Sequence, residues 1–218
     1  QRHDPYFDPR EETGFIHLTT TNKMAQQRND YELKQLPGKE WKLSAQSLGQ
    51  IPDRRMPSES VICVKVGARI MFTTNDPEKR WVNGTLGTIV QIRTKDLGKL
   101  PVLDVELEDG ATVEVQQHKW ELFEYEHDGD GGLEESVIGS YTQYPITLAW
   151  AVTIHKGQGK TFDHVLMDIG WGAFAHGQLY VALSRCTTFK GLVLLKPFRL
   201  QDIILEQALC EFMRLNPT

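Results

Sequence analysis

Cysteine is scarce in this sequence, and the few cysteines form no recognisable pattern. Cys63, Cys186 and Cys210 are odd in number and far apart, and no CxxC pair is present. A zinc site or a disulfide framework is therefore not expected, and we predict no metal site. Free cysteines commonly pack as small apolar side chains. A reducing, cytoplasmic environment fits this usage best.

Long apolar runs and an excess of positive charge are also missing. No run approaches the ~20 residues of a membrane-spanning helix, and no signal peptide is visible, so we expect no membrane partner. The net charge of −5 and the pI of about 5.8 argue against a protein that coats nucleic acid with a wholly basic surface. A local basic groove remains compatible with these values.

The remaining composition is that of a folded domain. The chain has 218 residues, of which 40% are hydrophobic and 24% charged, enough to bury a core without disulfides. This length fits one domain, or one domain with a small insert. Residues 1–13 form a polar leader without an initiator Met, which we interpret as the start of a piece cut from a longer protein.

Both ends of the chain show the alternation of strands and helices that is typical of α/β proteins. A strand is predicted over Gly14–Thr19, and a helix begins at Thr21 or Asn22 and ends before Pro37-Gly38. In the second half, the apolar runs 164–170 and 191–198 are typical of strands buried on both faces. Helices are predicted over residues 146–156, 176–186 and 201–215, the first of them running into a polar turn that ends at Phe162.

The middle of the chain favours short antiparallel strands. Between Val66 and Tyr125, alternating runs are separated by turn residues, with Asp109-Gly110 a strong hairpin signal and Asn83-Gly84 a second tight turn. This pattern predicts a small barrel. The Gly-rich stretch 127–136 is predicted to be a loop. It does not fit a calcium loop, because glycine stands where oxygen ligands are needed.

The segment GQGKT, Gly157 to Thr161, ends like a phosphate-binding P-loop, whose pattern is GxxxxGK[ST]. The first glycine of that pattern would stand at position 154, where the chain has Ile154. The segment also follows a stretch predicted to be helical, whereas a P-loop follows a strand. We therefore reject a P-loop here, and the sequence contains no other candidate.

Taken as a whole, the surrounding segments carry a resemblance. LAWAVTIHKGQG at 148–159 is followed by YVALSR at 180–185, and both are preceded by FIHLTTTNKMAQQRN at 15–29 and by GARIMFTTND and WVNGTLGTIV at 67–76 and 81–90. In this order they resemble motifs of superfamily 1 DNA helicases of the RecD/Pif type. The resemblance runs from Gly14 to about Phe198.

The resemblance implies a fold and a domain division. The α/β part would be a RecA-like (P-loop NTPase-type) parallel sheet domain, the second of its kind in the family, formed by residues 14–65 and 144–218. Residues 66–143 would be an inserted small SH3-like β-barrel with the Gly-rich loop.

The resemblance also implies roles for individual residues. An arginine supplied by a neighbouring domain stabilises charge on a transferring phosphoryl group, and this role falls on Arg185, with Gln158 beside it in catalysis. Gly159 and Arg185 would face the nucleotide. Polar side chains that hold a phosphate backbone without reading sequence would bind single-stranded DNA, and these are Thr20, Asn22, Thr153, His155 and Lys156.

Some features depart from the family. Many members carry Ser where this chain has Gly157, and the pair Lys160-Thr161 receives no role from the resemblance. The first RecA-like domain, with its P-loop lysine and acidic metal-binding pair, is absent. ATP and Mg²⁺ would thus be bound mainly by that N-terminal RecA-like domain, a partner of this chain in the full-length protein. The fragment alone would hold no cofactor and would not hydrolyse ATP, and the full-length helicase would move 5′ to 3′.

Two other functions remain open. A non-enzymatic module that binds nucleic acid or protein through the barrel would keep its binding in residues 66–125, and changes at Gln158 would have no effect. A small P-loop kinase would bind ATP through Lys160.

Two tryptophans are also open to interpretation. Trp81 either stacks on a base or fills the barrel core. For Trp150, core packing is the favoured interpretation.

Overall fold

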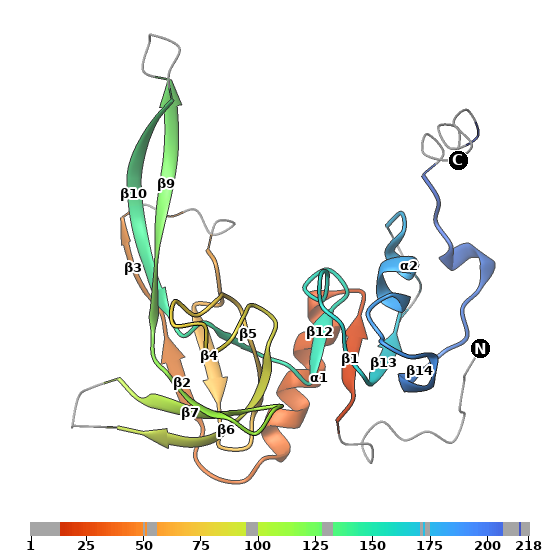
Figure 1. Cartoon of the computed structure of the whole chain (residues 1–218), viewed down its shortest axis with the longest axis horizontal. Helices are drawn as coiled ribbons and strands as arrows, with labels where there is room; N and C mark the ends of the chain where they lie inside the picture. Colours follow the sequence, from red (N-terminus) through yellow and green to blue (C-terminus); the bar gives the residue numbers. More distant parts are fainter. Residues whose placement is uncertain are drawn as a thin grey trace. The chain divides into compact units, whose positions relative to one another are not determined.

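The computed structural model of the chain describes residues 14–49, 51, 56–94, 100–127, 133–170, 172, 175–206 and 214. These residues form two compact units (Figure 1). The first comprises residues up to Glu32 together with those from Ala149, and the second comprises Leu33–Leu148. None of the helices in the described part of the chain is long and apolar enough to cross a membrane.

The first unit is built on a four-stranded, fully parallel sheet of order β12-β1-β13-β14, whose strands lie side by side in Figure 1. The central strands β1 and β13 are almost entirely buried, as expected for a sheet covered on both faces. The elements of this unit are β1 (Ile16–Thr19), α1 (Asn22–Gln35), β12 (Ala151–Thr153), β13 (Val165–Asp168), α2 (Gln178–Leu183), the 3₁₀ turn η2 (Phe189–Gly191), β14 (Leu192–Leu194) and the 3₁₀ turn η3 (Leu200–Asp202).

A buried asparagine holds α1 against the outer strand of this sheet. Asn29 is 8% exposed, its side-chain amide donates to the carbonyl of Ala151 at 2.9 Å, and its oxygen accepts from the Ala151 N–H at 2.8 Å. The side chain therefore satisfies both backbone groups of one residue of β12, as a neighbouring strand would. The helix begins where the Thr21 hydroxyl accepts from the Met24 N–H at 3.3 Å, as the sequence predicts.

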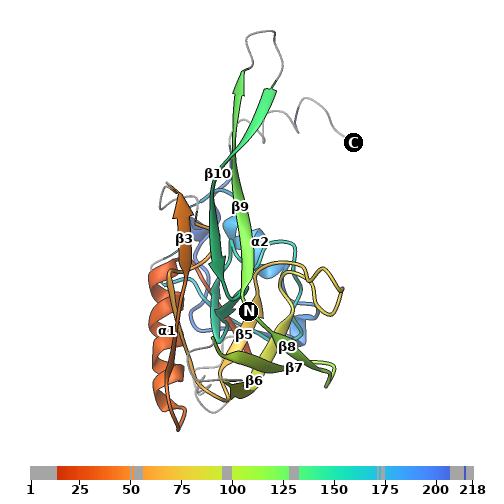
Figure 2. The same ribbon diagram turned by 90° about the vertical axis from the view of Figure 1, so that its left-hand side faces the viewer.

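In the described part of the second unit, every sheet is antiparallel. A five-stranded sheet has the order β11-β5-β6-β7-β8, a three-stranded sheet the order β3-β10-β9, and β2 pairs with β4. Its strands are β2 (Trp41–Ser44), β3 (Gln46–Gly49), β4 (Val61–Val64), β5 (Arg69–Phe72), β6 (Leu86–Arg93), β7 (Val102–Leu107), β8 (Thr112–Val115), β9 (His118–His127), β10 (Leu133–Gln143) and β11 (Ile146–Leu148). Figure 2 shows β9 and β10 as a long ribbon that extends beyond the β5–β8 strands of the same unit.

The short strands expected between Val66 and Tyr125 are confirmed. The turn at Asp109-Gly110 joins β7 to β8, and Gly110 has the positive φ of 84° that such a turn requires. The unit begins at Leu33, so β2, β3 and β4, which were expected in the RecA-like domain, belong to the same unit as the strands of the predicted insert. The assignment of this unit as an SH3-like barrel remains a prediction.

Three predicted elements need correction. His127 ends β9 and Leu133–Ser136 belong to β10, so the predicted loop 127–136 is wrong at both ends, while Asp128 and Asp130 lie outside the described residues. Residues 203–206 are not helical, and 207–213, which the same prediction included, lie outside the described residues.

The predicted helix over 146–156 is also wrong, because this stretch contains β11 and β12. Ala151–Thr153 pairs in parallel with β1, and this long-range pairing decides its conformation. Trp150 lies half-buried at the bend between the two strands, so it is not part of an apolar helix.

Candidate functional site

Two of the predicted motifs meet at the carboxyl end of the parallel sheet. Thr19 of β1 lies in register with Thr153 of β12, and the Ile154 N–H donates to the Thr19 carbonyl at 2.9 Å. The residues that follow each strand therefore emerge at the same edge: Thr20 and Asn22 after β1, and His155 and Lys156 after β12. In open α/β sheets, ligands bind outside the carboxyl ends of the strands.

The two threonines at this edge serve the local structure. Thr153 is 6% exposed, and its hydroxyl oxygen accepts from the Lys156 N–H at 3.2 Å. Thr20 is 8% exposed, and its hydroxyl faces the sulfur of Met24 at 3.7 Å. Both side chains thus shape the turns that present their neighbours.

Three other predicted DNA contacts differ from the threonines because they face outward. Asn22, His155 and Lys156 are exposed. Within the described part of the chain, none of these three side chains forms a hydrogen bond or an ion pair, so their polar groups are available to a ligand.

The turn after β12 is a compact backbone structure. The N–H of Gly157 donates to the Thr153 carbonyl at 3.0 Å, that of Gln158 to His155 at 3.1 Å, and that of Lys160 to Gly157 at 3.2 Å. Gln158 and Gly159 are exposed.

From the sequence, a P-loop was rejected partly because this turn was expected to follow a helix. The turn follows strand β12, so that part of the reasoning is wrong. The P-loop is still rejected, because position 154 is Ile and the turn leads to Phe162 and β13 without a helix.

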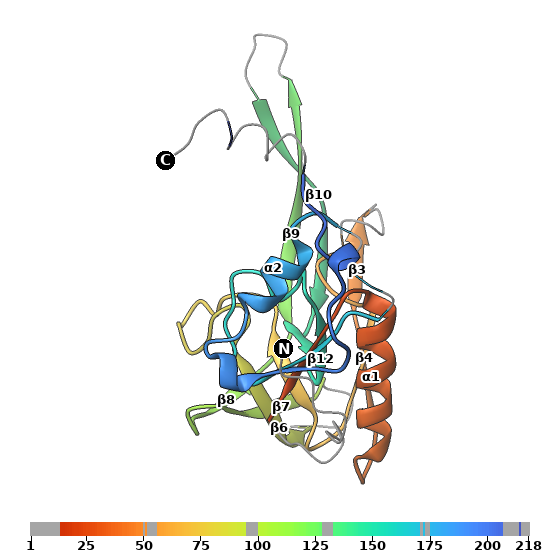
Figure 3. The same cartoon turned by 90° about the vertical axis from the view of Figure 1, so that its right-hand side faces the viewer.

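Arg185 joins the YVALSR segment to this turn. It follows α2, and its Nη1 donates to the Lys160 carbonyl at 2.9 Å, while the Phe162 N–H donates to the Arg185 carbonyl at 2.8 Å. The structure therefore brings Gln158, Gly159 and Arg185 into one corner of the first unit. The helix α2, labelled in Figure 3, leads to this arginine and belongs to the same unit as β12. Among the described residues, no carboxylate lies within ion-pair distance of Arg185.

Two residues of this corner were not among the site residues that the helicase resemblance selects. Lys160 is half-buried, and both its burial and the nearby positive charge of Lys156 lower the pKa of its ammonium group. Asp168 ends β13 in register with Thr19, and its carboxylate accepts from the Gly170 N–H at 2.9 Å. The position of Asp168 at the end of a buried strand was one available signal, and the place of Lys160 in the same short polar turn as Lys156 was the other.

The arrangement favours anionic ligands. Lys156, Lys160 and Arg185 are cationic groups at one sheet edge, and phosphate oxygens are the natural acceptors for such groups. The described residues contain no group of three or more His, Cys, Asp or Glu side chains that could hold a metal ion. The cationic groups of the corner are therefore suited to hold a phosphate.

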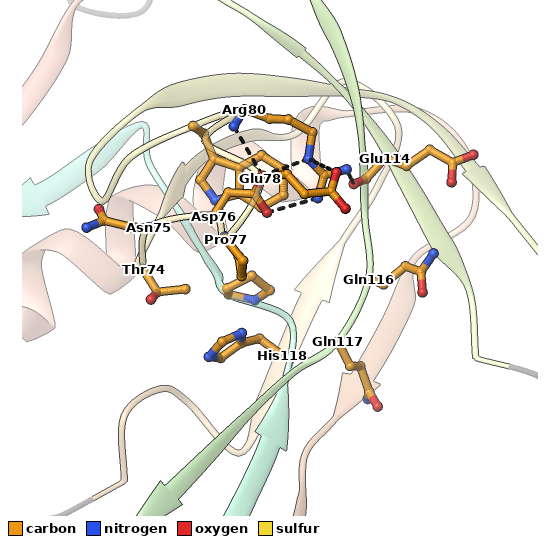
Figure 4. A pocket seen from close by; sticks show the side chains of 12 residues that line it. Thr74, Asn75, Asp76, Pro77, Glu78, Arg80, Glu114, Gln116, Gln117 and His118 are labelled. Atoms are coloured by element: carbon orange, nitrogen blue, oxygen red, sulfur yellow. Dashed lines mark hydrogen bonds and ion pairs between the residues drawn. The ribbon is translucent and has the colours of Figure 1, made fainter.

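The second unit has a pocket of about 290 Å³, shown in Figure 4, in which Arg80 pairs with Asp76 and Glu78. The Arg80 guanidinium contacts the Asp76 carboxylate through Nε at 2.7 Å and Nη2 at 2.9 Å, which lowers the pKa of Asp76. Trp81 is 6% exposed and stacks on Phe72, with ring centroids 4.3 Å apart. Trp81 therefore packs in the core of this unit, and the alternative that it stacks on a base is not supported.

Comparisons with known proteins identify relatives. No family model matches the sequence. The chain is 37% identical over 139 residues to the ATP-dependent DNA helicase Pif1 of Bdellovibrio bacteriovorus, covering 64% of this chain and 28% of that protein. It is 37% identical over 169 residues to the ATP-dependent DNA helicase PIF1 of Danio rerio, covering 75% and 24%. The chain thus spans about a quarter of the length of these relatives.

Solved structures agree with the sequence relatives. Unliganded Pif1 from Bacteroides sp. has a TM-score of 0.82 and 32% identity, with 98% of this chain and 48% of that chain covered. Bacteroides Pif1 in complex with ADP-AlF3 and ssDNA has a TM-score of 0.76 and 32% identity, with 97% and 47% covered. The sheets are consistent with the RecA-like domain of a superfamily 1 helicase. Over the stretch that it shares with these homologues, the chain belongs to the Pif1 helicase family.

The glycine that departs from the family allows a specific prediction. A Cβ at Gly157 would meet Leu18 Cδ2 at 3.5 Å and the Thr153 carbonyl oxygen at 3.6 Å, which are ordinary contacts. We expect Gly157→Ser to leave the melting temperature of the chain within about 2 °C of the parent. The matched variant Gly159→Ser, two residues along the same turn, should lose about 1–2 kcal/mol, because the φ of Gly159 is +75°. Calorimetry of both variants checks this, and equal melting temperatures for the two would contradict it.

Proposed function

We propose that the chain forms part of an ATP-dependent 5′–3′ DNA helicase, to which it contributes an arginine finger and contacts to single-stranded DNA. The observation that carries the proposal is the position of Arg185. Its guanidinium is held on the backbone of the turn that also presents His155, Lys156 and Gln158. One small region thus offers groups for a nucleotide phosphate and for a DNA backbone.

The nucleotide role follows from charge. Phosphoryl transfer spreads negative charge over the equatorial oxygens of the γ-phosphate, and an arginine from a second domain stabilises that charge. Arg185 has no carboxylate partner among the described residues, so its charge is not already neutralised by an ion pair. Gln158 and Gly159 are exposed in the same corner and complete this face.

ATP and Mg²⁺ require further residues. The sequence has no GxxxxGK[ST] loop, and the described part has no acidic cluster for a metal. Because the chain spans about a quarter of its relatives' length, we assign the phosphate cradle and the metal ligands to an N-terminal RecA-like domain of the complete protein. In that protein ATP would supply the energy for movement, and the bound Mg²⁺ would neutralise charge between its phosphates.

The DNA role rests on the exposed side chains at the carboxyl end of β1 and β12. Asn22, His155 and Lys156 carry donors that suit phosphate oxygens, and none is paired within the described part of the chain. Backbone contacts of this kind carry no sequence information, which suits a motor that moves along any strand. Bacteroides Pif1, a structural neighbour, has been solved with ADP-AlF3 and ssDNA.

The turn 154–160 links the two roles. Its first residues after β12 are the proposed DNA contacts, and its last residue, Lys160, accepts a hydrogen bond from Arg185. A shift of this turn on DNA binding would therefore move the acceptor of the arginine. The parallel-sheet unit would act as the second RecA-like domain, and the antiparallel unit would be its SH3-like insert.

We expect Lys156→Ala in the complete protein to weaken binding to oligo-dT several-fold. The loss of one phosphate contact should also reduce the slope of log K against log salt by about 0.7. Fluorescence anisotropy titrations at several salt concentrations measure both quantities. Because the Lys156 side chain is exposed, the melting temperature should not change.

The control for this prediction is Lys34→Ala. Lys34 is an exposed lysine in the last turn of α1, at the opposite end of the helix from Asn22. This variant should bind as the parent does. An unchanged affinity and salt slope for Lys156→Ala would contradict the proposed DNA contact.

A further inference from the structure

Ser184 provides one of three hydrogen-bond acceptors that surround the Arg185 guanidinium. Arg185 donates from Nε to the Val181 carbonyl at 3.0 Å, from Nη1 to the Lys160 carbonyl at 2.9 Å, and from Nη2 to the Ser184 hydroxyl oxygen at 2.9 Å. All three acceptors belong to the chain itself. The orientation of the guanidinium plane is therefore set by both the helix end and the turn.

The direction of the Ser184 hydroxyl follows from its own donor bond. Ser184 Oγ donates to the Val181 carbonyl at 2.9 Å, which uses its single hydrogen. Only lone pairs then remain toward Arg185, so the oxygen is committed to act as an acceptor. A side chain without this oxygen would leave Nη2 with one contact fewer.

The same contacts leave part of the guanidinium available. Arginine carries five N–H donors in a planar fork, of which three are used here. One remaining N–H is on Nη1 and the other on Nη2. The two nitrogens belong to one planar fork, so both can reach the oxygens of one phosphate when the plane is held still.

We propose that Ser184 is a positioning residue for Arg185. Its hydroxyl fixes the guanidinium so that the two remaining donors face the transferring phosphoryl group together. This inference rests on the proposed arginine-finger role and deepens it. In this proposal Ser184 acts through Arg185, and we assign it no contact of its own with ATP or DNA.

The experiment compares Ser184→Ala and Ser184→Thr in the complete protein, with saturating oligo-dT. Loss of a hydrogen bond to a charged group should lower kcat for ATP hydrolysis on the order of tenfold in Ser184→Ala. KM for ATP and Kd for oligo-dT should change less than about twofold, because the lost contact serves the transition state. Ser184→Thr should restore kcat, since a threonine hydroxyl in a helix can also bond the carbonyl three residues earlier.

A double variant separates positioning from an independent role. If Ser184 acts through Arg185, adding Ser184→Ala to Arg185→Ala should reduce turnover no further than Arg185→Ala alone. The matched control is Ser47→Ala, an exposed serine of β3 in the other unit, which should keep the parental kcat.

The outcomes distinguish this inference from the proposed function. A parental kcat for Ser184→Ala, with turnover lost in Arg185→Ala, would overturn the inference and leave the arginine finger intact. A parental rate for Arg185→Ala would overturn the proposed function itself. If Ser184→Ala proves unstable, the affinity of Ser184→Thr for ADP-AlF4 tests the inference instead. An affinity equal to that of the parent supports positioning of Arg185 by the hydroxyl. A loss of affinity as large as that of Arg185→Ala contradicts it.

Discussion

Replacing Arg185 with alanine in the complete protein is expected to reduce DNA-stimulated ATP turnover by about a thousandfold or more, the usual contribution of an arginine finger. The guanidinium has donors that are not used within the described part of the chain and no carboxylate partner there. Its removal should therefore affect the transition state rather than substrate binding. Steady-state hydrolysis with saturating oligo-dT measures kcat and KM separately.

Two further variants make this result interpretable. Arg185→Lys keeps the charge but loses the planar fork, so its turnover should stay close to that of Arg185→Ala. Arg28→Ala removes an arginine of α1 that pairs with Glu32 on the helix surface, and turnover should be retained. Parental hydrolysis by Arg185→Ala would rule out the arginine-finger role.

Elements with strong local signals were predictable from the sequence. The apolar run at 164–170 became β13 because its residues are buried on both faces, and Thr21 begins α1 because its hydroxyl caps the first turn. Asp109-Gly110 forms its hairpin because only glycine adopts a positive φ there without strain. In each case, the signal lies within a few residues of the sequence.

Elements decided by distant contacts were not predictable. The stretch 146–156 is largely apolar, and its periodicity does not distinguish a helix from a buried strand. Pairing of β12 with β1, more than a hundred residues earlier, makes it a strand. The extension of β10 into the predicted loop likewise depends on its long pairing with β9.

The candidate site shows the same division. The resemblance selected Gln158, Gly159 and Arg185, and the structure brings them into one corner. The contacts that hold Arg185 there involve a backbone carbonyl at Lys160 and a side chain at Ser184. A carbonyl leaves no mark in a sequence, so the connection between the two motifs could not be inferred from residue types.

The second large effect is expected at Gln143, the last residue of β10. Its side chain is completely buried, and Nε2 donates to the carbonyls of Leu43 at 3.0 Å and Glu59 at 3.1 Å, with Ser60 at 3.4 Å. Its Oε1 accepts from the Tyr144 N–H at 3.0 Å. One amide thus joins β10, β2 and the segment before β4.

Gln143→Leu should therefore destabilise the second unit by about 3 kcal/mol or more, because a similar volume is kept while several buried backbone groups lose a partner at about 1–3 kcal/mol each. Hydrogen exchange of the amides in β4 and β10 measures the loss within this unit. The matched control is Gln91→Leu, at an exposed position of β6, which should stay within about 0.5 kcal/mol of the parent.

Gln143→Glu tests the chemistry of this contact further. An ionised carboxylate can only accept, and at this position it would face carbonyl oxygens, so the loss at neutral pH should exceed that of Gln143→Leu. Burial raises the pKa of such a carboxyl in the folded state, so the destabilisation should diminish as the pH falls through the folded pKa and the protonated acid regains one donor. A loss that does not depend on pH, or a Gln143→Leu variant as stable as the parent, would show that the amide hydrogens do not hold these strands together.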